Sequence, residues 1–135
     1  MTALGKSFCI IAIGLLFLAY SNFAPTSLAS DQIADYVKNH FVREVIFGAA
    51  LSVLAILAIA RASSPGGLLQ AALLGGIVIL PFWIGAAAGW STGGMEAVWG
   101  ERIDSAAAYW LHGVQTALFI VGLLLMIPLG LKTRA

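Results

Sequence analysis

The sequence predicts an all-α integral membrane protein in which four transmembrane helices form an antiparallel bundle with both termini in the cytoplasm. Hydrophobic residues make up 61% of the 135 residues and charged residues only 10%, and the mean hydropathy is +0.98. A water-soluble domain of this size lacks the polar surface to cover so many apolar side chains. In lipid, continuous apolar runs satisfy their backbone groups by forming helices.

Four apolar runs are long enough to cross a bilayer, whose hydrocarbon core of about 30 Å takes roughly 20 helical residues. Within a single domain, 1–135, they cover about residues 5–24, 41–62, 68–90 and 106–131. We expect the first helix to end near Phe23, because Pro25 cannot continue the hydrogen-bonding pattern. The helix-breaking residues of segment 63–67 predict a tight turn between the second and third runs.

The charged residues divide into two groups along the chain, and this division predicts the topology. The termini and the turn between the second and third runs carry four basic residues and no acid: Lys6, Arg61, Lys132 and Arg134. The other two connections carry three basic residues and all six acids: Lys38, Arg43, Arg102, Asp31, Asp35, Glu44, Glu96, Glu101 and Asp104. The groups sum to +4 and −3, in agreement with the net charge of +1. Since an excess of Lys and Arg marks the cytoplasmic side, we expect both termini there.

A short amphipathic helix is expected before the second span. Its apolar residues recur at helical spacing, and they are Ile33, Tyr36, Val37 and Phe41. Ser30 or Asp31 can cap its start. The segment either lies flat on the outer leaflet or extends the second spanning helix.

The first run also has the layout of a secretory signal. Lys6 precedes an apolar core, and Ser27 and Ala29 are small residues of the kind that a signal peptidase prefers. Cleavage after Ala29 would leave three helices and an N-terminus on the outside. The apolar run is longer than a typical signal core, which favours retention of the first helix.

Small residues indicate where the helices approach one another, because in lipid close packing rather than the hydrophobic effect holds helices together. The predicted packing residues are Gly48, Ser52, Gly76, Gly85 and Gly89. The last two form a small-xxx-small pattern at the outer end of the third helix. Pro81 is expected to kink this helix just before Phe82 and Trp83.

Polar residues inside the spans are the first candidates for a functional site. His112, Gln115 and Thr116 follow the spacing i, i+3, i+4, so they share one face of the fourth helix. We expect this face to point into the bundle. Arg43 and Glu44 lie at the outer end of the second span and could reach His112. A structural imidazole held between helices explains His112; a proton or solute path through Glu44, His112 and Gln115 is the alternative.

The two histidines leave two cofactor hypotheses open. His40 and His112 both fall on the outer side and could ligate one haem b. His40 and Glu44 could instead share a metal ion with His112. Without a His-rich cluster, and with Cys9 as the one cysteine, we expect neither a metal nor another cofactor.

Several classes of activity lack their sequence signatures. The chain contains no nucleotide-binding glycine motif and no Gly-x-Ser-x-Gly nucleophile motif. Its basic residues are too few and too scattered for nucleic-acid binding. We therefore expect that the protein is not an enzyme and does not bind nucleic acid.

The order of motifs along the chain resembles that of a known family. Residues 13–18 read Ile-Gly-Leu-Leu-Phe-Leu, Pro25 lies in the first outer loop, and Arg43-Glu44 precede Gly48. With four spans in 135 residues, this layout resembles the DoxX-like group of small bacterial inner-membrane proteins. It departs from the group in its long glycine-rich second outer loop and in lacking a basic residue just after the first helix. The resemblance implies a bacterial cytoplasmic membrane and an accessory role, and it assigns no functional residue.

Two classes of function follow. The first is a non-enzymatic membrane component, a small accessory or scaffold subunit whose partners are the lipid bilayer and other membrane subunits or further copies of itself. The second is a small transporter or channel, or a haem- or quinone-linked redox protein, that uses the polar site around His112.

Overall fold

The computed structural model describes residues 2–28, 35–92 and 105–131. These residues form four helices: α1 (Ala3–Leu28), α2 (Asp35–Arg61), α3 (Pro65–Thr92) and α5 (Ser105–Leu131). Three segments of the described part are long and apolar enough to span a membrane: Val42–Arg61, Pro65–Ala87 and Tyr109–Ile127. The described part of α1 includes a shorter apolar segment, Ala3–Leu18. The predicted all-α class is confirmed, and the three spans agree with a multi-pass membrane protein.

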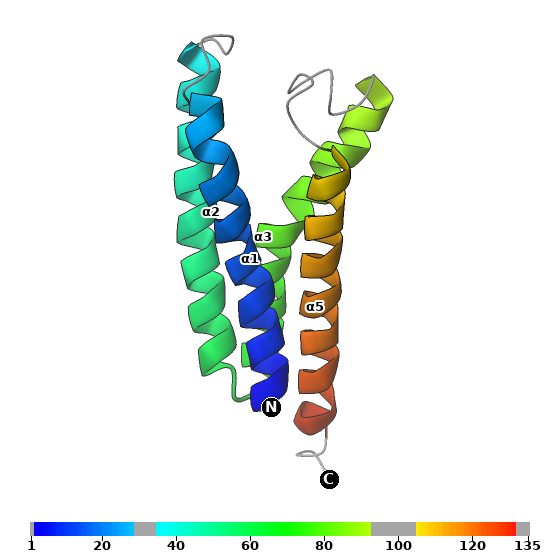
Figure 1. Ribbon diagram of the computed structural model, residues 1–135. Helices are drawn as coiled ribbons and strands as arrows, with labels where there is room; N and C mark the ends of the chain where they lie inside the picture. The colour runs from blue at the N-terminus through cyan, green and yellow to red at the C-terminus, as the bar shows by residue number, and fades with distance from the viewer. Residues whose placement is uncertain (1, 29–34, 93–104, 132–135) are drawn as a thin grey trace.

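The four helices lie side by side, and the chain starts and ends at the same end of the molecule (Figure 1). Helix α1 packs against α2 and α5, and helix α3 packs against the same two helices. Helices α2 and α5 therefore occupy opposite corners of the bundle. Toward the other end, the α1–α2 pair leans away from the α3–α5 pair (Figure 1). We call these the terminal end and the far end.

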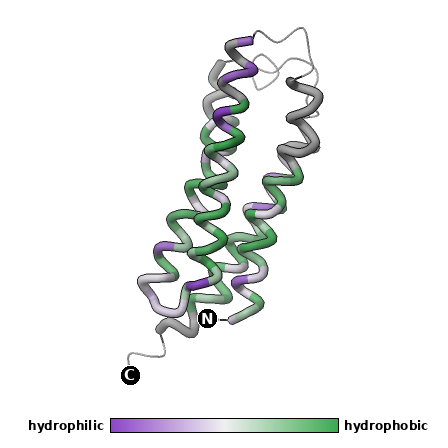
Figure 2. Tube along the Cα trace, turned by 90° about the vertical axis from the view of Figure 1, so that its left-hand side faces the viewer, coloured by the Kyte–Doolittle hydropathy of each residue, from purple (hydrophilic) through white to green (hydrophobic). Residues whose placement is uncertain are grey.

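Each helix buries one stripe of residues at a spacing of three or four. In α1 the stripe is Cys9, Ala12, Ile13 and Leu16, and in α2 it is Ser52, Ala55 and Ile59, followed by the buried Ala62 just after the helix. The opposite faces are apolar as well, since Phe47 is 68% exposed and Trp110 76%. Hydrophobic residues continue along the middle of the helices, and hydrophilic ones lie mainly toward the two ends (Figure 2). A helix that is apolar on every side belongs in lipid.

At the terminal end, three side chains form hydrogen bonds with backbone groups at the helix ends. Thr2 caps α1, because its Oγ1 accepts from the backbone N–H of Gly5 at 3.2 Å. Ser64 caps α3 in the same way, accepting from Gly67 at 3.2 Å, and Pro65 occupies the first helical position. Lys6 Nζ donates to the carbonyl of Ala60 at 2.8 Å, where the last carbonyls of α2 lack partners within the helix.

Two predicted boundaries are wrong. Helix α1 continues through Pro25 to Leu28 rather than ending near Phe23, because a proline removes one backbone hydrogen bond, and helices in membranes tolerate this through small local adjustments. The predicted turn 63–67 is shorter, since Pro65, Gly66 and Gly67 belong to the first turn of α3. A proline at this position costs no hydrogen bond, because the first N–H groups of a helix have no partner within it.

The predicted amphipathic helix is, in its described part, an extension of α2. The helix runs without interruption from Asp35, and Asp35 lies 3.9 Å from Lys38 as an i, i+3 pair. The proposed caps Ser30 and Asp31 lie outside the described residues. Of the two predicted alternatives, the extension of the second span is the one observed.

Helix α3 is continuous and contains Pro81. Its second half leans away from α2 (Figure 1). Pro81 lacks the N–H that would bond to the carbonyl four residues earlier, which is a common cause of a bend in a helix. The lean carries Phe82 and Trp83 alongside α5.

Candidate functional site

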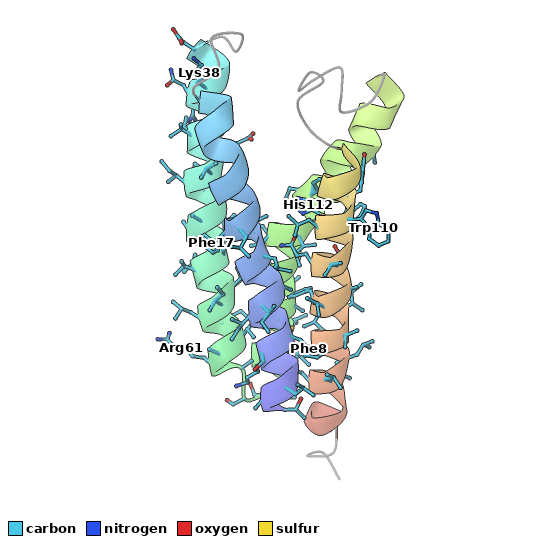
Figure 3. The ribbon with its side chains drawn as sticks, viewed as in Figure 1. Phe8, Phe17, Lys38, Arg61, Trp110 and His112 are labelled. Carbon is cyan, nitrogen blue, oxygen red and sulfur yellow. The ribbon has the colours of Figure 1, made fainter. Side chains whose placement is uncertain are left out.

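The predicted polar face of α5 points into the bundle. Gln115 is 1% exposed and His112 is half-buried, whereas Trp110 on the other side of the helix is 76% exposed. In Figure 3, Trp110 points away from the other helices and His112 lies on the side that faces them. The i, i+3, i+4 prediction for His112, Gln115 and Thr116 is therefore confirmed as a shared inward face.

Hydrogen bonds connect these three residues to one another and to α3. Nδ1 of His112 donates to Oε1 of Gln115 at 2.9 Å. Thr116 Oγ1 donates to the backbone carbonyl of His112 at 2.7 Å. Because this leaves the lone pairs of the hydroxyl available, Thr116 also accepts from the indole Nε1 of Trp83 at 2.9 Å. A side chain of α3 is thus bonded to the polar face of α5.

Aromatic rings cover this hydrogen-bonded group. The ring of Phe82 stacks on the imidazole of His112, with centroids 3.6 Å apart and planes 18° apart. Phe82 also meets Tyr109 edge-on at 5.6 Å and Trp83 edge-on at 5.2 Å. Edge-to-face and offset-stacked pairs are favourable arrangements of aromatic side chains. We call the six residues together the α3–α5 cluster: Phe82, Trp83, Tyr109, His112, Gln115 and Thr116.

One polar atom of the α3–α5 cluster is unpaired. Among the described residues, the amide Nε2 of Gln115 is a buried donor without a hydrogen-bond partner. Exchanging the amide nitrogen and oxygen would leave Oε1 unpaired instead, so either orientation of the amide has one unsatisfied atom. A buried unsatisfied donor costs about 1–3 kcal/mol. The indole of Trp83, the hydroxyl of Thr116 and Nδ1 of His112 form hydrogen bonds within the cluster, whereas Nε2 of Gln115 does not.

The structure does not bring Arg43 or Glu44 into the cluster. Both are exposed and lie on α2, at the corner of the bundle opposite α5, whereas the side-chain partners described for His112 and Thr116 lie on α3 and α5. The side chain of His40 lies outside the described residues, so the haem and metal hypotheses that need it remain predictions. Within the described ranges, no group of three or more His, Cys, Asp or Glu side chains is arranged to hold a metal ion.

Two of the predicted packing glycines are wrong. A Cβ at Gly85 would meet nothing within 4 Å, and one at Gly76 would meet only Leu80 of its own helix at 3.9 Å. The small-xxx-small pattern therefore lies on an outward face of α3, as far as the structure describes it, since Gly89 is outside the residues whose surroundings are described. Ser52 is fully buried, as predicted, and its hydroxyl donates to the carbonyl of Gly48 at 2.7 Å within α2.

The tight helix contacts involve glycines that sequence reasoning missed. A Cβ at Gly122 would lie 2.8 Å from the carbonyl oxygen of Gly5, and a Cβ at Gly5 would lie 2.8 Å from that of Gly122. Helices α1 and α5 therefore touch backbone to backbone, beside a hydrogen bond of 3.6 Å from Cys9 Sγ to the carbonyl of Phe119. In the same way, Gly75 of α3 leaves room for the ring of Phe119.

The described part of the chain thus contains an inward polar cluster that two helices build and aromatic rings cover. No protein-family model, no curated protein and no solved structure matches the sequence.

Proposed function

We propose that the protein is a non-enzymatic integral membrane protein that serves as a small accessory or scaffold subunit of a larger membrane complex. The observation that carries this proposal is how the α3–α5 cluster uses its polar groups. The hydroxyl of Thr116 and the indole of Trp83 bond to each other, and the imidazole of His112 is bonded on one side and stacked on Phe82. Groups engaged in this way hold helices together rather than carry out proton or group transfer.

Loss of the hydrogen bond between Trp83 of α3 and Thr116 of α5 should lower the stability of the bundle modestly. Trp83→Phe removes the indole donor to Thr116 and keeps a ring, so we expect the free energy of unfolding to fall by about 0.6 kcal/mol, the average for such bonds between membrane helices. Trp110→Phe is the matched control, because Trp110 is 76% exposed and should tolerate the change. Unfolding titrations in mixed micelles measure both. Equal losses for the two variants would contradict a packing role for Trp83.

The proposal includes four antiparallel spans, with both termini in the cytoplasm of a bacterial cell. The charge division of the sequence supports this topology. Arg61 and Lys38 lie at opposite ends of α2 (Figure 3), and the bond from Lys6 to Ala60 joins the start of α1 to the end of α2. With 26 residues, α1 is about 39 Å long at 1.5 Å per residue, enough to cross the bilayer.

Cysteine labelling in intact cells tests the topology. In a Cys9→Ser background, a membrane-impermeant maleimide should label Glu101→Cys from the outside and should reach Lys132→Cys only after the cells are opened. The reason is that the two positions belong to opposite charge groups, one acidic and one basic. Labelling of both positions from the same side would exclude a single span between them and, with it, the proposed topology.

The packing of α1 supports its retention. Cys9, Ala12 and Ile13 are fully buried, and Gly5 makes a backbone contact with α5. Cleavage after Ala29 would remove this stripe from the core and expose the facing residues of α5. We therefore expect the intact mass of protein purified from its native membrane to include residues 1–29. A mass that corresponds to a chain beginning at Ser30 would rule out the four-helix bundle.

Purification from the native membrane tests the accessory role itself. We expect the protein to leave a mild detergent extract together with other membrane polypeptides and without a visible chromophore, in line with the layout shared with DoxX-like proteins. A Soret band would instead support the haem-linked alternative. Solute or proton flux in vesicles that Gln115→Leu abolishes would support the transporter alternative. Either result would displace the scaffold proposal.

A further inference from the structure

We propose that the α3–α5 cluster binds a lipid-soluble aromatic molecule that carries an acceptor oxygen, and that the side-chain amide of Gln115 donates to this oxygen. The site goes beyond the scaffold role and does not depend on it. Its starting point is the buried amide group of Gln115, which the packing of the described helices leaves unsatisfied.

The unpaired amide indicates a partner from outside the described chain. Gln115 is 1% exposed, and its Nε2 has no partner among the described residues. Nearly all buried polar side-chain atoms in native proteins are hydrogen-bonded, to the protein, to water or to a ligand. The amide cannot turn away to solvent, because its Oε1 accepts from Nδ1 of His112 at 2.9 Å. An oxygen acceptor placed at Nε2 would complete the hydrogen bonds of this amide.

The surroundings of the amide favour an aromatic molecule. His112, which holds the amide, stacks on Phe82, and Phe82 meets Trp83 and Tyr109 edge-on. All four of these residues are half-buried, so the rest of the chain leaves part of each residue exposed. Sites for small molecules typically combine apolar and aromatic walls with a few polar groups that fix orientation. A flat ring can stack on these side chains while its oxygen meets Gln115.

The position of the cluster along the helix favours entry from the bilayer. His112 lies within the apolar segment Tyr109–Ile127, nearer its first residue than its last. The outward faces beside it are apolar, with Ile84 66% exposed and Val114 48% exposed. A molecule that reaches this point from lipid must itself be lipid-soluble.

Photolabelling with benzophenone tests the site in the full-length protein in lipid nanodiscs. Benzophenone is an aromatic ketone that attaches to neighbouring C–H bonds when it is excited by light. We expect saturable labelling on the peptides that contain Phe82–Trp83 or Tyr109–Thr116. Fluorenone, a flat aromatic ketone, should compete for this labelling about tenfold better than fluorene, which has the same rings and no oxygen, because one hydrogen bond in an apolar site is worth about that factor.

The matched variants are Gln115→Leu and Gln70→Leu. Gln115→Leu removes the donor and should lower the apparent affinity for fluorenone about tenfold, while Gln70→Leu, at an exposed position of α3, should leave it unchanged. The comparison of fluorenone with fluorene is made on the unmodified protein. It therefore tests the hydrogen bond to the oxygen of the ligand even if Gln115→Leu folds poorly. Equal competition by the two compounds, labelling spread over outward residues of other peptides such as Phe47 of α2, or an ordered water as the only partner of the amide would overturn the proposal.

Discussion

Replacing Gly122 by alanine should destabilise the bundle by about 1–3 kcal/mol, the usual cost of forcing an extra methyl group into a well-packed core. The new Cβ would lie 2.8 Å from the carbonyl oxygen of Gly5 and 2.9 Å from the backbone nitrogen of Cys9. Both are backbone atoms of α1, so no side-chain rotation relieves the clash, and the two helices have to move apart. Separation of α1 from α5 would also weaken the hydrogen bond from Cys9 Sγ to the backbone carbonyl of Phe119.

Gly113→Ala provides the control on the same helix. Nothing lies within 4 Å of a Cβ at Gly113, and alanine is the better helix former, so this variant should be as stable as the original protein or slightly more stable. Unfolding in mixed micelles, followed by circular dichroism, measures the two variants side by side. If Gly122→Ala matched Gly113→Ala, α1 and α5 would not be in backbone contact, and the retention of α1 would lose its main support.

The helices themselves were predictable because lipid leaves the backbone little choice. Apolar runs that cannot bond to water form helices, so composition and run length were enough to identify α2, α3 and α5. The helix ends were less predictable. Pro25 and Pro65 both signal a break in the sequence, yet one lies within α1 and the other begins α3. A membrane helix tolerates the one hydrogen bond lost at Pro25, and at Pro65 no bond is lost, because the first N–H groups of a helix have no partner within it.

The inward face of α5 was predictable, but its neighbours were not. The spacing of His112, Gln115 and Thr116 puts them on one side of any helix. Their partners Phe82 and Trp83 depend on how α3 is placed against α5, which the sequence does not encode locally. The contact of Arg43 and Glu44 with His112 was predicted because all three residues are expected at a similar depth in the membrane. A similar depth does not decide which helices are neighbours. The Pro81 signal, directly before Phe82, was the one hint of where α3 turns toward α5.

The packing glycines show the same limit. The small-xxx-small rule identifies candidates on every face of a helix, and in a chain with 15 glycines it cannot choose among them. Gly75 and Gly76 are neighbours in sequence, but consecutive residues point about 100° apart around a helix of 3.6 residues per turn. One therefore meets Phe119 of another helix, and the other meets only Leu80 of its own.

This pair of neighbours provides the second large effect. Gly75→Ala should lower the free energy of unfolding by about 1–3 kcal/mol, because the new Cβ would overlap three atoms of the Phe119 ring, which is 5% exposed and packed in the core. Gly76→Ala, one residue away, should have no such cost. Thermal unfolding of the two variants in the same detergent makes the comparison independent of overall helix propensity.

A double substitution separates this clash from a general weakness of α3. Phe119→Leu removes the ring atoms that the new methyl group would meet, so Gly75→Ala should cost less in the Phe119→Leu protein than in the original one, with a coupling within the range of about 0.5–3 kcal/mol found for residues in contact. If instead the two losses simply added, the methyl group at position 75 would act through something other than Phe119. Helix α3 would then have to pack on α5 by a different face, and the bond between Trp83 and Thr116 could not form as described.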